Sequence, residues 1–281
     1  MNTTTSLRLT IVCENTVGKP LPLIGEHGFA CLLDCQAGRI LFDTGRGASL
    51  LHNLAVLGID PASIEAIVLS HGHDDHTGGL LSLLREIGPR PVYAHPGIFA
   101  ERFHQRGEDR RAIGMQATPV ELEKAGAHLR FIEEFTELGH GLWFSGTIPR
   151  RSRLEAGDPA LVCINGEGEI HGDPLLDDAA LAVETPKGLV IVLGCAHAGL
   201  INTVDYLRSR LNDRPVHVII GGMHLGPAPV EQFEATVHYL HQLGRTRLCA
   251  CHCTGLQQTA TLQTRLPKRV FFASVGSVLE V

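Results

Sequence analysis

Short apolar runs separated by turn-forming residues open the sequence. The runs LRLTIVCEN, FACLLDC and RILFDTG each end in Gly, Asn or Asp, as β-strands joined by tight turns do. This pattern predicts an antiparallel meander of three strands.

From about Gly47 the apolar positions recur at helical spacing, and strands and helices then alternate. The run ASLLHNLAVLGI predicts a helix, AIVLS a buried strand, GGLLSLLREIG a second helix and PVYAHP another strand. After residue 180 a similar order returns, with a hairpin in LAVETPKGLVIVLG and then helices alternating with strands, the final strand being RVFFASVGSVLEV. Two such halves predict an α/β protein, an αββα sandwich of two mixed β-sheets with helices outside.

No low-complexity linker separates the halves, so we expect residues 1–281 to form one domain. Residues from about 100 to 160 are more charged and less regular, and GLWFSGTIPRRSRLEAGD within them is loop-like. We interpret this range as a lid-like insertion over the main body.

Composition and net charge limit the classes of substrate and partner that the protein is expected to bind. Hydrophobic residues make up 44% and charged residues 19% of the chain, which is typical of a folded protein. The net charge of −6 predicts a small-molecule substrate rather than nucleic acid or an anionic membrane surface. The sequence has neither an apolar run long enough to span a membrane nor a signal-like opening, so we expect a cytoplasmic protein with free thiols. It does not indicate an oligomeric state.

The highest concentration of potential metal ligands lies in SHGHDDHTGG, residues 70–79, directly after the end of AIVLS. Residues at i and i+2 on a chain leaving a strand point the same way, so His71 and His73 can hold one ion while Asp75 and His76 face a second. Such ligands suit Zn²⁺, with Mn²⁺ or Fe²⁺ as alternatives. A polar turn or helix N-cap would explain one histidine but not three at this spacing.

Further histidines follow three later apolar runs, and the ends of such runs converge on one sheet edge. We predict His197 and His252 as metal ligands, whereas His224 could equally be a buried histidine bonded to the backbone. The other histidines are expected on the surface, among them His52, His104, His128, His238 and His241.

The H-x-H-x-D-H motif in SHGHDDHTGGL, with Asp43-Thr44-Gly45 upstream, resembles the metallo-β-lactamase fold superfamily. The stretches PVYAHP, TIPR, DDAAL, LGCAHAGLINT, IGGMHL and CHCTG are similar to the branch named for 7,8-dihydropterin-6-ylmethyl-4-(β-D-ribofuranosyl)aminobenzene 5'-phosphate synthase. The resemblance implies two metal ions, held by His71, His73, Asp75, His76, His197 and His252.

One position departs from the superfamily pattern. Cys195 stands where the resemblance implies a bridging Asp, and His197 takes the place of a histidine that the pattern supplies from an earlier loop. Whether Cys195 or His224 contacts a metal stays open at this point. A single ion, or a weakly occupied second site, would also be compatible with the missing bridge.

These residues predict a metal-dependent hydrolase that acts through a metal-bound hydroxide on a small ester, lactone or phosphate-bearing substrate. The resemblance adds a pterin-related substrate to these candidates. Asp75 would orient the nucleophile, and His224 would stabilise the oxyanion or protonate the leaving group. Arg150 and Arg151 are candidates for binding a substrate phosphate or carboxylate, although a solvated loop explains them equally well.

Two alternatives come from other functional classes. One is a transferase that joins a dihydropterin to a ribofuranosyl-aminobenzene phosphate, as the branch name implies. The other is a non-catalytic metal- or pterin-binding protein, in which oxidation of the cluster Cys249, Cys251 and Cys253 would matter. The sequence indicates no cofactor besides the metal.

Overall fold

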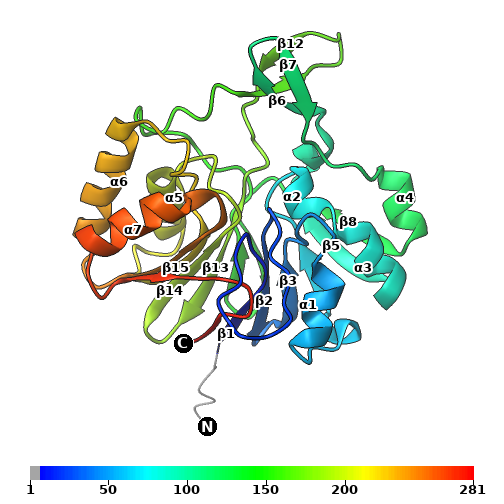
Figure 1. The fold of residues 1–281 in the computed structure, drawn as a ribbon, viewed down its shortest axis with the longest axis horizontal. Coiled ribbons are helices and arrows are strands. Elements are labelled where there is room, and N and C mark those ends of the chain that lie inside the picture. The colour runs from blue at the N-terminus through cyan, green and yellow to red at the C-terminus, as the bar shows by residue number, and fades with distance from the viewer. Residues whose placement is uncertain (1–6) are drawn as a thin grey trace.

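Two seven-stranded β-sheets pack face to face at the centre of the protein, and helices cover both outer faces (Figure 1). The computed structural model describes residues 7–281. The predicted αββα sandwich is confirmed.

The first sheet is antiparallel from β18 to β3 and parallel from β3 to β8. Its strands, in sheet order, are β18 (Val278–Glu280), β1 (Arg8–Cys13), β2 (Ala30–Cys35), β3 (Gly38–Phe42), β4 (Ala66–Val68), β5 (Arg90–Ala94) and β8 (Ala127–Phe131). The predicted opening meander corresponds to β1, β2 and β3.

The second sheet is also mixed, with a parallel half from β17 to β14 and an antiparallel half from β14 to β9. Its strands, in sheet order, are β17 (Val270–Phe272), β16 (Arg247–Cys251), β15 (Val216–Gly222), β14 (Gly188–Leu193), β13 (Ala180–Thr185), β10 (Leu142–Phe144) and β9 (Thr136–Gly139).

The helices divide between the two outer faces (Figure 1). The first sheet is accompanied by α1 (Leu50–Val56), α2 (Asp74–Thr77), α3 (Leu80–Ile87) and α4 (Pro119–Lys124), and the second by α5 (Leu200–Arg210), α6 (Val230–Gln242) and α7 (Leu256–Arg265). Three 3₁₀ turns complete the elements: η1 (Pro61–Ser63), η2 (Pro96–Phe99) and η3 (His252–Thr254).

Strand β14 shows how the sequence produces these layers. Val190 and Val192 belong to the core between the sheets, whereas Leu189 and Ile191 pack with the residues of the outer helices. A strand covered on both faces needs apolar residues at every position, which explains the continuous run GLVIVL.

A separate four-stranded sheet projects beyond the sandwich, at the top of Figure 1. In sheet order it consists of β12 (Ile170–Gly172), β11 (Leu161–Ile164), β6 (Arg102–Arg106) and β7 (Asp109–Ala112). Only part of the range 100–160 therefore belongs to this projecting sheet, because β8, β9 and β10 are strands of the two main sheets. A lid-like role for this excursion stays a prediction.

Two local predictions were wrong. The final run RVFFASVGSVLEV is two strands, with β17 in the second sheet and β18 in the first, so the chain crosses between sheets at Ala273–Ser277. The loop-like stretch after residue 140 contains β10, whose pairing with β13 outweighs its polar neighbours. Within residues 7–281, no helix combines the length and the apolar character needed to cross a bilayer.

Candidate metal centre

The first group of site residues follows β4. His71 and His73 lie on the short segment after this strand, and α2 begins directly after His73 and carries Asp75 and His76. A Cβ at Gly72 would collide with the carbonyl oxygen of Ile98, so only glycine lets this segment pass so close to another backbone.

The second group comes from the parallel half of the other sheet. Strands β14, β15 and β16 are neighbours, and the chain beyond their carboxyl ends carries His197, His224 and His252. Ala196, His224 and His252 have positive φ values of 57°, 46° and 52°, a costly conformation for residues other than glycine. The backbone is therefore strained at the three turns that direct His197, His224 and His252 toward the first group.

Three imidazoles form one cluster, made of His71, His73 and His197. Their ligand atoms all lie within 4.8 Å of one another, and His71 Nε2 is 3.0 Å from His73 Nδ1. Within the described residues, His73 Nε2 and both ring nitrogens of His197 are buried without a hydrogen-bond partner. Buried polar atoms are normally paired, so these nitrogens indicate a group still to be bound.

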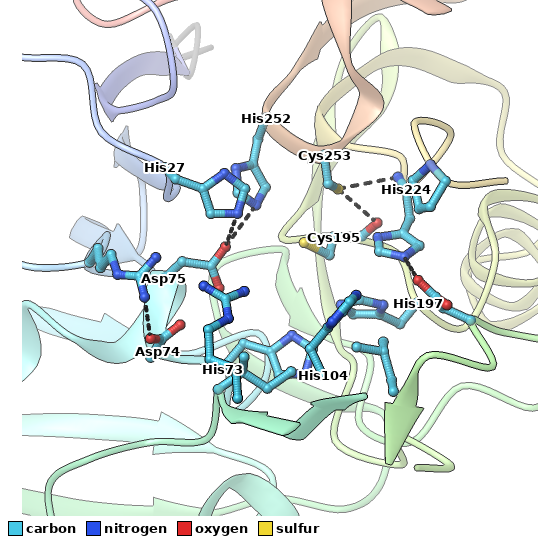
Figure 2. A pocket seen from close by; sticks show the side chains of 16 residues that line it. His27, His73, Asp74, Asp75, His104, Cys195, His197, His224, His252 and Cys253 are labelled. Carbon is cyan, nitrogen blue, oxygen red and sulfur yellow. Dashed lines mark hydrogen bonds and ion pairs between the residues drawn. The ribbon is translucent and has the colours of Figure 1, made fainter. Parts of the chain in front are cut away.

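Asp75, His76 and His252 form a second cluster. His252 Nε2 lies 3.2 Å from His76 Nε2 and 3.4 Å from Asp75 Oδ2, and His76 Nε2 is 3.9 Å from Asp75 Oδ1. His27 approaches Asp75 from the solvent side, with its Nε2 at 3.2 Å (Figure 2).

Carboxylate and amide oxygens fix the rings of the second cluster. Asp43 Oδ2 contacts His76 Nδ1 at 2.7 Å, and Asn15 Oδ1 contacts His252 Nδ1 at 3.0 Å. Glu14 accepts a hydrogen bond from the backbone nitrogen of His252 at 2.8 Å. Such outer contacts fix the ring orientation of metal-binding histidines.

The adjacent residues Asp177 and Asp178 brace the loops of the first cluster. Asp177 accepts a hydrogen bond from the backbone nitrogen of Gly72, and Asp178 accepts one from Ala198, both at 2.8 Å. The DDAAL stretch thus ties together the histidine loops of both sheets.

The pKa values differ between the clusters. Burial and the neighbouring imidazoles hold the pKa of His71 and of His197 well below the usual range, and burial lowers that of His73 to about 3. Neutral imidazoles keep a lone pair free, which is the form that binds metal.

The second cluster favours positive charge. Burial alone would lower the pKa of His76, but the carboxylates of Asp75 and Asp43 outweigh it and raise the pKa to about 9. Burial likewise opposes ionisation of Asp75, yet His76, His252 and His27 hold its pKa well below the usual range. A cation is therefore stabilised here.

Together the clusters fit two divalent ions of the first transition row. The donors are imidazole nitrogens and a carboxylate, and these ligands suit such metals. The unpartnered nitrogens of the first cluster and the anionic surroundings of the second support this fit.

Cys195, His224 and Asp158 lie beside the clusters. Cys195 Sγ is 3.2 Å from His76 Nε2, and the ring centroids of His224 and His197 are 4.2 Å apart. His224 Nε2 is 3.5 Å from Asp158 Oδ2. Burial would lower the pKa of His224, but Asp158 and Cys253 raise it to about 10.

A pocket of about 280 Å³ opens at this place (Figure 2). Among its lining residues are the predicted His73, Asp75, His197, His224 and His252. Others were not predicted as site residues: His27, Arg46, His104, Arg111, Asp158 and Cys253. His104, expected on the surface, is only partly exposed, because the projecting sheet turns it into the pocket.

The two predicted substrate-binding arginines lie elsewhere. Arg150 donates hydrogen bonds to the carbonyl oxygens of His197 at 2.7 Å and Pro174 at 2.8 Å. Arg151 lines a different hollow, together with Tyr206. Their proposed contact with substrate stays a prediction, and the arginines at the pocket are Arg46 and Arg111.

Known proteins share the sequence pattern and the fold of this chain. The family model described as the metallo-beta-lactamase superfamily matches residues 27–199. The chain is 33% identical over 261 residues to 7,8-dihydropterin-6-methyl-4-(beta-D-ribofuranosyl)-aminobenzene-5'-phosphate synthase of Methanocaldococcus jannaschii, a match that covers 90% of this chain and 89% of the relative.

Two further relatives carry names of hydrolases. Hydroxyacylglutathione hydrolase of Xylella fastidiosa is 26% identical over 255 residues, covering 79% of this chain and 94% of the relative. The crystal structure of a metal-dependent hydrolase of the β-lactamase superfamily superposes with a TM-score of 0.83 at 26% identity, covering 98% of this chain and 99% of that one.

Proposed function

The chain belongs to the metallo-β-lactamase superfamily, and on this premise we propose that it is a metal-dependent hydrolase of a small anionic ester. The observation that carries the proposal is the pair of adjacent donor clusters, of which His73, Asp75, His197 and His252 line one pocket. A pocket of about 280 Å³ suits a small molecule better than a polymer.

We assign the first ion to His71, His73 and His197, and the second to Asp75, His76 and His252. Zinc, when bound there, would supply Lewis acidity and lower the pKa of water to roughly 7. Its identity is part of the proposal, with Mn²⁺ or Fe²⁺ as alternatives.

The protein's own groups would orient the reaction. Asp75 lines the pocket and reaches both His252 and His27, so its carboxylate can hold the attacking water in place. His224 lies across the pocket beside Asp158, where its ring can donate a proton to the leaving group (Figure 2).

The rim of the pocket favours a negatively charged substrate. Two arginines line it: Arg46 comes from the loop after β3, and Arg111 from strand β7 of the projecting sheet. Arg111 pairs in register with His104 of β6, so both side chains lie on the same face of the projecting sheet. Guanidinium and imidazole groups together suit a phosphate or carboxylate.

One relative favours a second candidate, a synthase reaction. Its name specifies a 5'-phosphate and a dihydropterin, and a phosphate would suit the same arginines. The donor clusters support hydrolysis more directly, because they supply the metal chemistry that hydrolysis needs. A metal- or pterin-binding protein without turnover remains the third outcome of the experiment.

Elemental analysis alongside activity tests the proposal. The wild-type protein is compared with His71→Ala and His252→Ala, one from each cluster, and with His128→Ala on exposed β8 as the control. We expect about two zinc ions per chain, fewer in both cluster variants, and hydrolysis of phosphate esters, lactones or thioesters only by the wild type and the control.

Other outcomes separate the candidates. Full metal content without hydrolysis, accompanied by dihydropterin-dependent condensation, would favour the synthase. Pterin binding without any turnover would favour the binding protein. A metal content unchanged in both cluster variants would refute the assigned ligands.

A further inference from the structure

We propose that a side pocket next to His197 and His224 binds the non-reacting part of the substrate, and that this part is an uncharged group that carries hydroxyls. The inference rests on the proposed function, because it takes the reacting, anionic part of the substrate to lie in the main pocket at the metal centre.

The side pocket adjoins the main pocket. Its volume is about 190 Å³, against about 280 Å³ for the main pocket. Neither space alone reaches the roughly 300–1,000 Å³ of ordinary small-molecule pockets, which favours one ligand that occupies both. The residues that border both spaces are Asp158, His197, His224 and Pro227. The side pocket thus lies next to the place where a bound substrate would react.

His197 supplies a polar group without a partner at the shared wall. It is 5% exposed, and neither of its ring nitrogens has a hydrogen-bond partner within residues 7–281. One of these nitrogens is assigned to the first ion. The other ring nitrogen of a metal-binding histidine almost always has a partner of its own, as His76 has in Asp43. A hydrogen-bond acceptor in the side pocket would give His197 that partner.

The charges of the two pockets are opposite in sign. Glu155 and Asp158 line the side pocket, whereas none of its described lining residues is an arginine or a lysine. Glu155 is 1% exposed and is held in place by two backbone nitrogens of α5, at 2.8 and 2.9 Å. Arg46 and Arg111 line the main pocket instead. A substrate that spans both spaces would therefore place its anionic end in the main pocket and an uncharged end in the side pocket.

The rest of the wall favours a ring that carries hydroxyls. Three prolines and two alanines form the apolar sides of the side pocket: Pro159, Ala196, Pro227, Ala228 and Pro229. Gln232, in the first turn of α6, adds an amide that can both donate and accept a hydrogen bond. A hydroxyl also does both, so it can accept from His197 and donate to Asp158. The carbon face of such a ring would pack on the prolines.

Isothermal titration calorimetry of the zinc-loaded protein tests the side pocket without requiring turnover. The probes are inorganic phosphate, cyclohexylmethylphosphonate and a form of this phosphonate with three ring hydroxyls, none of which can be hydrolysed. We expect the wild type to bind the hydroxylated phosphonate about 10-fold more tightly than the plain one, as one or two added hydrogen bonds would produce.

Two variants change the side pocket from different segments. In Ala228→Trp the indole would fill the space, so both ring phosphonates should bind at least about 10-fold more weakly while inorganic phosphate binds as in the wild type. In Gln232→Leu the preference for hydroxyls should fall by roughly 3- to 10-fold. If one variant fails to fold, the other still tests the side pocket.

Each variant has a matched control away from the side pocket. Ala260→Trp lies on the exposed side of α7, and Gln242→Leu lies at the opposite end of α6 from Gln232. Both controls should bind all three probes as the wild type does.

The outcomes are distinct. The inference would be overturned by a wild type that binds none of the probes, or that binds the hydroxylated phosphonate no more tightly than the plain one. Ring phosphonates that bind Ala228→Trp as tightly as the wild type would overturn it too. If such a protein still hydrolyses phosphate esters, the proposed function stands and only the side pocket is lost. The expected binding pattern in a protein without hydrolysis would uphold the side pocket alone.

Discussion

Asp43 Oδ2 lies 2.7 Å from His76 Nδ1, and both side chains are fully buried. The same carboxylate accepts hydrogen bonds from the backbone nitrogen and the hydroxyl of Ser70, each at 2.7 Å. Because Asp43 engages Nδ1, the other ring nitrogen of His76 is the one that faces His252 and Asp75. Asp43 thereby determines which nitrogen His76 would offer to the proposed metal.

We predict that Asp43→Asn weakens zinc binding by roughly 10- to 100-fold, because the amide no longer fixes or polarises the ring of His76. Competition with a chromophoric chelator measures the affinity. Asp34→Asn is the matched control, since Asp34 pairs with Arg39 at the surface. Equal affinities of both variants and the wild type would contradict the orienting role.

Local sequence patterns predicted the residues that the structure brings together in the two clusters. His71, His73, Asp75 and His76 lie within one motif, and His197 and His252 follow apolar runs that end at one sheet edge. Strand periodicity is a local property, so the two layers of the sandwich could also be predicted.

Other parts of the site depend on contacts between distant segments. Glu14, Asn15 and His27 approach His252 and Asp75 only because the first sheet places its loops beside β16. No motif marks them, and their spacing from the histidines is set by packing.

The crossing of the last strand between sheets has the same origin. The run at residues 269–281 is apolar enough to resemble one strand. Its first part, β17, nevertheless pairs with β16, and its last part, β18, pairs with β1. Sequence pattern predicts a strand but does not predict its partner.

Metal removal should destabilise the protein. Chelation leaves buried imidazoles such as His73 and His197 with ring nitrogens that lack partners among the described residues. A ligand present at 100 times its Kd contributes about 2.7 kcal/mol, so we expect Tm to fall by several degrees on chelation and to recover with zinc. Differential scanning calorimetry measures the shift. In His73→Ala the shift should shrink, and a Tm insensitive to chelator in the wild type would argue against a structural contribution of the metal.

Arg111→Ala should raise KM for an anionic substrate while kcat stays close to that of the wild type. A hydrogen bond to a charged group contributes about 1.5–3 kcal/mol, which corresponds to a rise of roughly 10- to 100-fold. Arg110→Ala is the control, because Arg110 is the neighbour on β7 and stacks on Phe103 instead of lining the pocket. Steady-state kinetics of both variants are measured with a hydrolysed phosphate ester and with its uncharged analogue. The same rise in KM for both substrates in Arg111→Ala would show that Arg111 does not recognise the charge of the substrate.

A buried group of charges lies at the base of strand β6 in the projecting sheet. Arg102 is 3% exposed and donates to Asp173 at 2.8 Å and to Asp177 at 2.6 Å. Arg102→Met leaves both buried carboxylates without their cation, so we expect a loss of about 3–5 kcal/mol in the free energy of unfolding. Urea denaturation measures it, with Glu280→Ala as the control, since Glu280 forms an exposed pair with Arg8 at 3.8 Å. Similar stabilities of the two variants would mean that the buried pair does not anchor the sheet.

Gly72→Ala should disturb stability and metal binding together. Gly72 separates His71 from His73, and a Cβ there would collide with the carbonyl oxygen of Ile98 and lie 2.5 Å from Nη1 of Arg102. Since a backbone oxygen cannot move aside freely, we expect a loss of about 1–3 kcal/mol and lower zinc occupancy. Gly172→Ala is the matched control, because no described neighbouring atom lies within 4 Å of the added carbon, and its effect should stay within about 0.5 kcal/mol. Urea denaturation and elemental analysis of the same samples test both parts. A stable Gly72→Ala protein with full zinc content would show that the segment between the two histidines can shift without moving their rings, and the close approach to Ile98 would then not position the ligands.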